Sequence, residues 1–187
     1  MTGWPQWALV AIWLGFGLAF SARARSTGSS AATTKRSPLA LLGIALQGVG
    51  FALAWSGVGR RGAAAVPVAL ATAGLVIGLG SAGLALVAVR HLGKQWALQA
   101  RLLEGHQLVT TGPYAYVRHP IYTAMLGMLV ATGLLTGALT PLAIGLVPFL
   151  VGTWIRTQRE EALLRGHFGE AFEAYRRRAG WLLPFVG

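Results

Sequence analysis

The sequence predicts an all-α polytopic membrane protein, a bundle of about five transmembrane helices followed by a cytoplasmic C-terminal amphipathic helix. Two observations predict this fold class. Only 11% of the 187 residues are charged and 55% are hydrophobic, whereas a soluble domain is about 25% charged. The chain also contains five stretches without Lys, Arg, Asp or Glu that approach or exceed the roughly 17–25 residues needed to cross a bilayer. Its length fits a single domain.

The predicted spans follow one another with short connections. No charged side chain precedes the first span, so we expect it to be retained as a helix and not cleaved as a secretory signal. Only Ala138 separates the last two spans, which predicts a tight helical hairpin; four spans plus a re-entrant segment is the alternative. Pro148 is expected to loosen the middle of the last span. The five spans are 4–20, 38–57, 66–89, 120–137 and 139–155.

The basic residues predict the orientation. All 16 Lys and Arg except Arg60 and Arg61 fall in three segments on one side of the predicted membrane. By the positive-inside rule, the N-terminus then lies outside and the C-terminus in the cytoplasm. Anionic lipid accounts for the net charge of +11, so no nucleic-acid partner is expected. The Ala, Gly and Arg content is typical of a GC-rich bacterial genome, which suggests the bacterial cell membrane.

Cysteine is absent from the chain, which excludes a disulfide scaffold, a thiolate metal site and a cysteine nucleophile. No metal site is expected. Small-residue pairs at 74 and 78 and at 133 and 137 permit close helix packing, but such pairs are common in membrane helices and indicate no function.

The first polar segment of interest, 108–122, lies before the fourth predicted span. A Gly-Pro pair at 112–113 is typical of a turn, and Pro120 suits the first position of a helix. Arg118 and His119 therefore stand at a helix N-terminus, where free backbone donors and the helix dipole favour an anion such as a carboxylate.

Three tyrosines in the same segment add hydroxyls and flat rings at the membrane interface. The alternative to an anion site is an aromatic belt with a snorkelling arginine. These tyrosines are Tyr114, Tyr116 and Tyr122.

The second polar segment, 156–175, follows the last span. Arg156 and Glu160 are four residues apart and share a helix face. The chain has five carboxylates, and four of them lie here, including the adjacent pair Glu160 and Glu161. The alternative is an amphipathic tail on the membrane surface with an exposed ion pair. An apolar stripe runs through Leu164, Phe168, Phe172 and Tyr175, and Gly166 and Gly169 are expected to interrupt the helix.

Together these segments resemble the isoprenylcysteine carboxyl methyltransferase family of integral membrane enzymes. The resemblance covers about 83–184, and Ala115 departs from it because the family often has a large residue there. The matching residues are Arg90-His-Leu-Gly93 with Trp96, Leu-Val-Thr-Thr-Gly-Pro-Tyr114, Arg118-His-Pro-x-Tyr122, Arg156-x-x-x-Glu-Glu161, Phe168-Gly with Tyr175, and Leu183-Pro184.

The resemblance implies S-adenosylmethionine as methyl donor, bound outside the Rossmann class, which agrees with the lack of a Gly-x-Gly-x-x-Gly strand motif. Arg118 and His119 would suit the donor carboxylate, and Arg156 would hold the carboxylate of the acceptor. Arg156 and Glu160 are therefore the candidate catalytic residues. The candidate cofactor-binding residues are Tyr114, Tyr116, Arg118, His119, Tyr122, Glu160 and Glu161, with Trp96 beside the adenine.

The acceptor is expected to be a lipidic or amphipathic molecule, with a prenylcysteine carboxyl group as the namesake. A carboxylate is already ionised at neutral pH, so methyl transfer to it needs alignment and desolvation, not a base. A phospholipid amine or a small thiol is the rival, and His119 or Glu161 would then be a candidate base. The oligomeric state has no signal in the sequence.

Two other classes remain open. One is a membrane reductase that uses a nicotinamide cofactor on sterols, and the other is a non-enzymatic scaffold or transporter. A transporter normally has polar residues or broken helices near the midplane. Gln47 is the only strong amide in the interior of a predicted span.

Overall fold

The computed structural model describes residues 3–24, 38–57, 66–95 and 107–186, and within these ranges it contains helices and no strand. The predicted all-α membrane bundle is confirmed. Each predicted apolar stretch is helical, and the last helix continues well beyond its apolar part. The helices are α1 (Trp4–Ala24), α2 (Pro38–Trp55), α3 (Val68–Leu92), α4 (Pro120–Thr136), α5 (Leu139–Phe168) and α6 (Glu170–Arg176).

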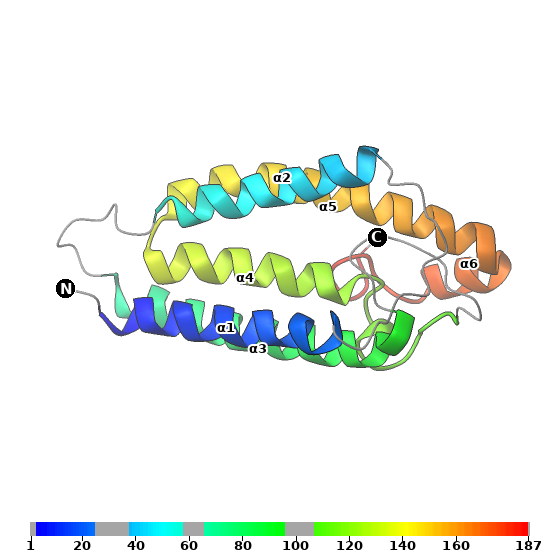
Figure 1. Cartoon of the computed structure of the whole chain (residues 1–187), viewed down its shortest axis with the longest axis horizontal. Helices are drawn as coiled ribbons and strands as arrows, with labels where there is room; N and C mark the ends of the chain where they lie inside the picture. The colour runs from blue at the N-terminus through cyan, green and yellow to red at the C-terminus, as the bar shows by residue number, and fades with distance from the viewer. Residues whose placement is uncertain (1–2, 25–37, 58–65, 96–106, 187) are drawn as a thin grey trace.

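The long helices run along one axis in alternating directions (Figure 1). Helix α2 packs along α5, while α1 and α3 pack together on the other side of the bundle, and α4 lies between these two groups. The start of α1 and the short helix α6 lie at opposite ends of the molecule. The end that carries α6 also holds the start of α4 and the polar end of α5, so it gathers the polar segments.

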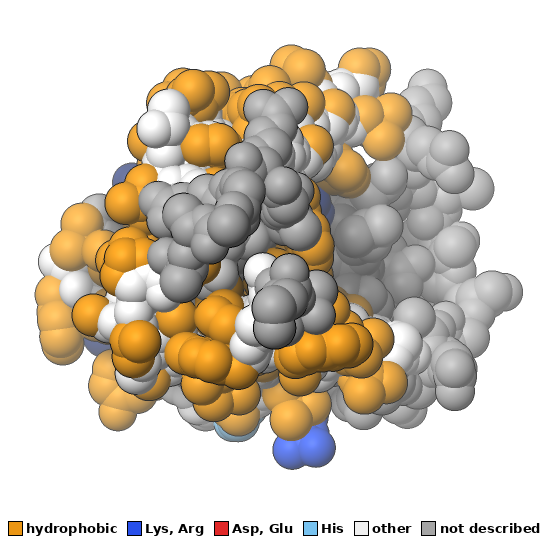
Figure 2. Space-filling model, turned by 90° about the vertical axis from the view of Figure 1, so that its left-hand side faces the viewer, with side chains coloured by type: hydrophobic (Ala, Val, Ile, Leu, Met, Phe, Trp, Pro, Cys, Tyr) orange, Lys and Arg blue, Asp and Glu red, His pale blue; other side chains and the backbone are white. Residues whose placement is uncertain are grey.

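Three of the described helices, α2, α3 and α5, are long and apolar enough to cross a membrane. Helix α4 is apolar but has 17 residues. The number of crossings therefore stays a prediction. Large hydrophobic side chains such as Leu14, Val76 and Val147 are exposed, as lipid contact requires. The end view in Figure 2 is dominated by hydrophobic side chains.

Helices α4 and α5 form a hairpin. Helix α4 ends at Thr136. The next residue, Gly137, has a φ of 65°, in the left-handed region that glycine adopts readily, and α5 begins two residues after it. Helix α5 remains continuous through Pro148. The predicted interruption at Gly166 is wrong, since a single helical glycine costs only about 1 kcal/mol. The helix ends where predicted, at Gly169, with a φ of 52°.

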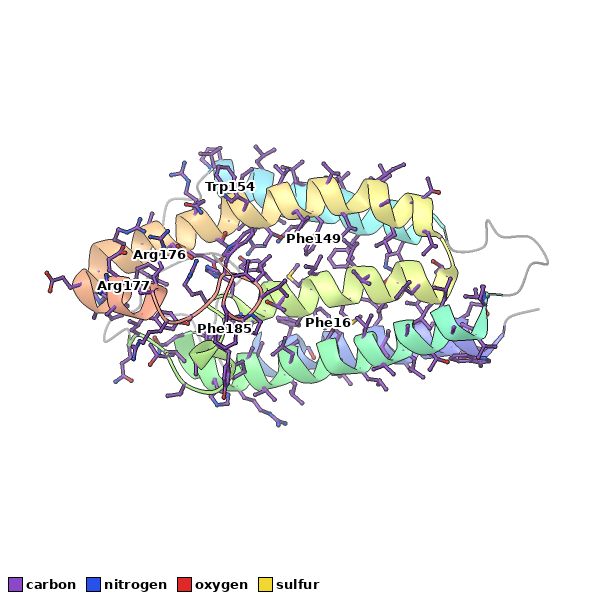
Figure 3. The ribbon with its side chains drawn as sticks, turned by 180° about the vertical axis from the view of Figure 1, so that it is seen from behind. Phe16, Phe149, Trp154, Arg176, Arg177 and Phe185 are labelled. Carbon is purple, nitrogen blue, oxygen red and sulfur yellow. The ribbon has the colours of Figure 1, made fainter. Side chains whose placement is uncertain are left out.

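Close packing of α2 on α5 depends on four glycines that face one another. A Cβ added to Gly50 would lie 2.7 Å from the backbone oxygen of Gly145, and one added to Gly152 would lie 2.5 Å from that of Gly43. The two backbones therefore touch at two levels seven residues apart. Phe149 lies between these levels on α5; it is fully buried and points toward α4 (Figure 3).

Candidate active site

The polar end of the bundle brings together the N-terminus of α4 and the part of α5 beyond its apolar segment. The α4–α5 hairpin folds the chain back on itself, so residues more than 40 positions apart meet. Helix α4 begins at Pro120. Proline suits this position because the backbone N–H of the first helical residue has no partner within the helix.

Arg118, His119 and Glu161 form a buried cluster at this junction, with exposed side-chain fractions of 5%, 5% and 6%. Arg118 Nε donates to Glu161 Oε1 at 2.9 Å. His119 Nε2 lies 3.0 Å from the same oxygen. Arg176 Nε, from α6, lies 3.7 Å from Glu161 Oε2. The carboxylate of Glu161 is therefore surrounded by cationic groups, and we call these four residues the Glu161 cluster.

His119 is placed between two carboxylates. Its Nε2 faces Glu161, and its Nδ1 lies 3.6 Å from Glu160 Oε2. Burial by itself lowers the pKa of His119, but the hydrogen bonds and charges of Glu160 and Glu161 outweigh it and raise the pKa above its ordinary value. Folding therefore shifts His119 toward its imidazolium form relative to a free histidine.

Arg118 also holds the C-terminal segment against the start of α4. Its Nη1 donates to the backbone oxygens of Arg176 and Ala179, at 3.1 and 2.6 Å. The backbone N–H of Arg118 donates to the oxygen of Gly180 at 2.8 Å, and Val117 and Gly180 form an isolated parallel bridge. The guanidinium is thus already engaged by Glu161 and by two carbonyls.

Two further contacts hold the same C-terminal segment. Thr123 Oγ1 donates to the backbone oxygen of Leu182 at 2.7 Å, and Trp181 Nε1 donates to Thr157 Oγ1 at 3.1 Å. Residues 179–182 therefore contact both helices of the hairpin, and sequence reasoning did not predict this.

Glu160 faces a different environment from its neighbour. Its side chain is 25% exposed, against 6% for Glu161, and Oε1 accepts a hydrogen bond from the Tyr122 hydroxyl. The guanidinium carbon of Arg156 lies 5.2 Å from the centre of the Tyr122 ring, which is within cation–π range. Of the adjacent pair, Glu160 is the carboxylate that a ligand can reach.

Arg156 is held from a third helix, because its Nη1 donates to Gln47 Oε1 on α2 at 3.0 Å. The sequence pointed to Gln47 only as an amide in the interior of a span. Its position inside an apolar helix is the signal that could have identified it, since buried polar groups in membrane helices have partners.

The other two predicted tyrosines differ in exposure. Tyr114 is buried, and its backbone oxygen accepts a hydrogen bond from the Tyr175 hydroxyl at 2.8 Å. Burial, followed by the nearby charge of Glu160, raises the pKa of its phenol, so the hydroxyl stays protonated. Tyr116 is 62% exposed. Trp96 lies outside the described residues.

The turn before α4 depends on Gly112. Its φ is 60°, and an added Cβ would lie 2.7 Å from Cε1 of His91 and still closer to other atoms of that ring. His91 in turn has its Nδ1 2.9 Å from the backbone oxygen of Val87. The Gly-Pro turn therefore rests on the end of α3, which places the residues that follow it against α5.

The described residues contain no group of three or more His, Cys, Asp or Glu side chains suited to hold a metal ion. The site consists instead of carboxylates, a guanidinium, an imidazole and phenols at the border of an apolar bundle. Such a set can bind a ligand that carries both negative and positive groups.

Comparison with known proteins identifies relatives for the part of the chain that forms this site. The model of the isoprenylcysteine carboxyl methyltransferase family matches residues 72–166. The chain is 37% identical over 85 residues to a protein-S-isoprenylcysteine O-methyltransferase of Schizosaccharomyces pombe, covering 43% of this chain and 34% of that protein. It is 33% identical over 103 residues to the nickel-cobalt-cadmium resistance protein NccN of Alcaligenes xylosoxydans xylosoxydans, covering 54% of this chain and 48% of that protein. The chain thus matches less than half the length of each relative.

Proposed function

The chain belongs to the isoprenylcysteine carboxyl methyltransferase family, and we propose that it is a membrane methyltransferase that transfers a methyl group from S-adenosylmethionine to a lipidic or amphipathic acceptor. The acceptor group that the site favours is a carboxylate, as in O-methylation of a prenylcysteine. The observation that carries this proposal is the arrangement of Arg156, Tyr122 and Glu160 beside the buried Glu161 cluster.

The chemistry of the exposed groups suits the donor. S-adenosylmethionine, when bound, supplies an electrophilic methyl group on a sulfonium and presents an ammonium, a ribose diol and a carboxylate. Glu160, with its partly exposed carboxylate, would bind the diol or the cationic groups, and the exposed ring of Tyr116 would face the adenine. His119 in its imidazolium form would favour the donor carboxylate.

In this proposal, Arg118, Glu161 and Tyr114 do not bind the donor directly but hold the residues that do. The side chains of Arg118 and Glu161 and the backbone oxygen of Tyr114 are buried and form hydrogen bonds within the protein. By holding the C-terminal segment and the start of α4 together, they would keep His119 and Tyr122 in place. A site held on rigid elements in this way reduces the entropy that must be lost when donor and acceptor align.

A carboxylate acceptor needs no general base, whereas an amine or a thiol must lose a proton before or during methyl transfer. His119, whose pKa is raised by two carboxylates, holds its proton to a higher pH than a free imidazole, and Arg156, held by Gln47, supplies a positive charge that suits a carboxylate. A carboxylate oxygen would take the methyl carbon directly, with the carbon–sulfur bond of the donor breaking as the carbon–oxygen bond forms and the electron pair remaining on sulfur. Arg156 would orient the carboxylate for this step.

We further propose that the site faces the cytoplasm of a bacterial cell. Arg118, Arg156, Arg165 and Arg176 lie on the segments that meet at the site, and the positive-inside rule places such a basic end in the cytoplasm. Prenylated or other lipidic acceptors would reach this border from the membrane.

Ligand binding tests the class of enzyme. Detergent-purified protein is titrated calorimetrically with S-adenosylhomocysteine and, separately, with a reduced nicotinamide cofactor. We expect the first compound to bind in the micromolar range and the second not to bind. Absence of S-adenosylhomocysteine binding at millimolar concentration would reject the methyltransferase. Methyl transfer from labelled donor into a prenylcysteine analogue and into a lipid extract then identifies the acceptor.

A further inference from the structure

Helix α2 holds the head of the Arg156 side chain. Gln47 is 3% exposed, its Oε1 accepts from Arg156 Nη1 at 3.0 Å, and its Nε2 donates to Thr153 Oγ1 at 2.9 Å. Arginine has only donors, so the amide oxygen must face Arg156 and the amide nitrogen must face Thr153. Both ends of the amide are therefore used, in a single orientation.

The same helix also makes room for the stem of Arg156. Gly43 lies one turn before Gln47, and a Cβ added to it would lie 2.6 Å from Cγ of Arg156 and 3.4 Å from its Cδ. Residues four apart share a helix face. Gly43 and Gln47 thus form a cradle in which the glycine accommodates the aliphatic stem and the amide binds the guanidinium.

The Tyr122 ring lies on another side of the guanidinium, 5.2 Å from ring centre to Cζ. Arg156 is therefore fixed by α2 and α4 as well as by its own helix, α5. A buried amide in an apolar helix is costly unless it is hydrogen-bonded, so the cradle also stabilises the packing of α2 on α5. Glutamine is neutral, and it fixes the arginine without adding a negative charge beside it.

We propose that Gly43 and Gln47 are positioning residues that hold the Arg156 guanidinium for the anionic group of the methyl acceptor. Helix α2, which lies outside the family match at 72–166, would then contribute to acceptor selection. This inference rests on the proposed function. It identifies negative charge as the property of the acceptor that α2 helps to recognise.

The test compares a charged with a neutral acceptor analogue. Dissociation constants of N-acetyl-S-farnesylcysteine and of its methyl ester are measured for the wild type and for Gln47→Met, which keeps the side-chain volume. The wild type binds the acid more tightly than the ester. In Gln47→Met, affinity for the acid falls on the order of tenfold, as expected when a charge-assisted hydrogen bond no longer orients the guanidinium, and affinity for the ester is unchanged.

Thr132→Val is the matched control. It removes another interhelical side-chain hydrogen bond, from Trp13 Nε1 to Thr132 Oγ1 at 3.1 Å, at a fully buried residue in the same bundle. If Gln47 had a purely structural role, both variants would be less thermally stable, and in both the ratio of the dissociation constants for acid and ester would stay at the wild-type value. We expect the ratio to change in Gln47→Met only.

A second variant covers the case in which Gln47→Met does not fold. Thr153→Val keeps Gln47 and Arg156 but removes the partner that fixes the amide; the affinity for the acid should fall about threefold, less than in Gln47→Met. A wild-type ratio in both folded variants, or equal binding of acid and ester by the wild type, overturns the inference. S-adenosylhomocysteine binding, measured on the same samples, reports separately on the proposed function.

Discussion

Arg118 Nε and Glu161 Oε1 lie 2.9 Å apart although 43 positions separate them in the chain. The pair joins the start of α4 to the polar part of α5, and both side chains are buried. Arg118 also binds two carbonyls of the C-terminal region. One side chain therefore links three segments that the membrane helices bring to the same end.

The first prediction concerns the stability of this pair. Glu161→Gln or Arg118→Met should lower the free energy of unfolding by roughly 3–5 kcal/mol, because each variant leaves a buried charge without its main partner. Thermal unfolding in detergent measures the loss. Arg165→Ala is the control, because it breaks an exposed ion pair with Glu173 and should change stability little. Equal losses in all three variants would contradict the special role of the buried pair.

The second prediction separates donor from acceptor contacts. Glu160→Gln should weaken binding of S-adenosylhomocysteine by about tenfold, since the partly exposed carboxylate would lose its charge. Arg156→Ala should leave that binding nearly unchanged. It should reduce turnover with a carboxylate acceptor by about a hundredfold or more, because the acceptor would lose the charged contact that orients it. Calorimetry and methyl-transfer kinetics measure the two effects. Wild-type activity in both variants would show that the site is assigned to the wrong residues.

The third prediction is a pH dependence from His119. Its pKa is raised in the folded protein, so the unfolded chain, with an imidazole pKa of about 6.5, loses its proton first as the pH rises. The stabilisation from His119 is therefore complete below about pH 6.5 and is lost as the pH rises through the raised folded value. Unfolding midpoints of the wild type and of His119→Gln, compared between pH 6 and pH 9, should converge at the alkaline end. A constant difference across that range would contradict the prediction.

The fourth prediction concerns the glycine contact between α2 and α5. Gly50→Leu should prevent native packing, because its Cβ alone would lie 2.7 Å from the backbone oxygen of Gly145 and from Cβ of Phe149. The variant should lose S-adenosylhomocysteine binding and should elute earlier than the wild type on size-exclusion chromatography, as a misfolded or aggregated protein does. Gly80→Ala on α3, where nothing lies within 4 Å of an added Cβ, is the matched control and should fold normally. A folded, ligand-binding Gly50→Leu protein would mean that the two backbones do not need this contact.

Sequence reasoning grouped residues that the structure brings together, but it did not predict how they are arranged. Local patterns identified the Arg-His-Pro start of α4 and the Glu-Glu pair, because turn residues, helix starts and scarce charges are readable one segment at a time. They did not identify Gln47, whose partner Arg156 lies 109 positions away. They also did not identify the C-terminal segment at 179–182, whose backbone contacts with the start of α4 have no local sequence signature.

The sequence by itself determined that this protein is a helical membrane bundle and that its candidate site residues lie at the polar border of the last two long helices, since composition and hydropathy can be read one segment at a time. Only the tertiary structure decided which partners each polar residue has. Successive residues on a helix point about 100° apart, so the rotation of α5 against α4 buries Glu161 with Arg118 and leaves Glu160 accessible beside Tyr122. The close approach of α2 to α5, set by facing glycines, places Gln47 on Arg156. Helix rotation and register depend on packing between distant segments, and for that reason the tertiary structure was needed to identify these contacts.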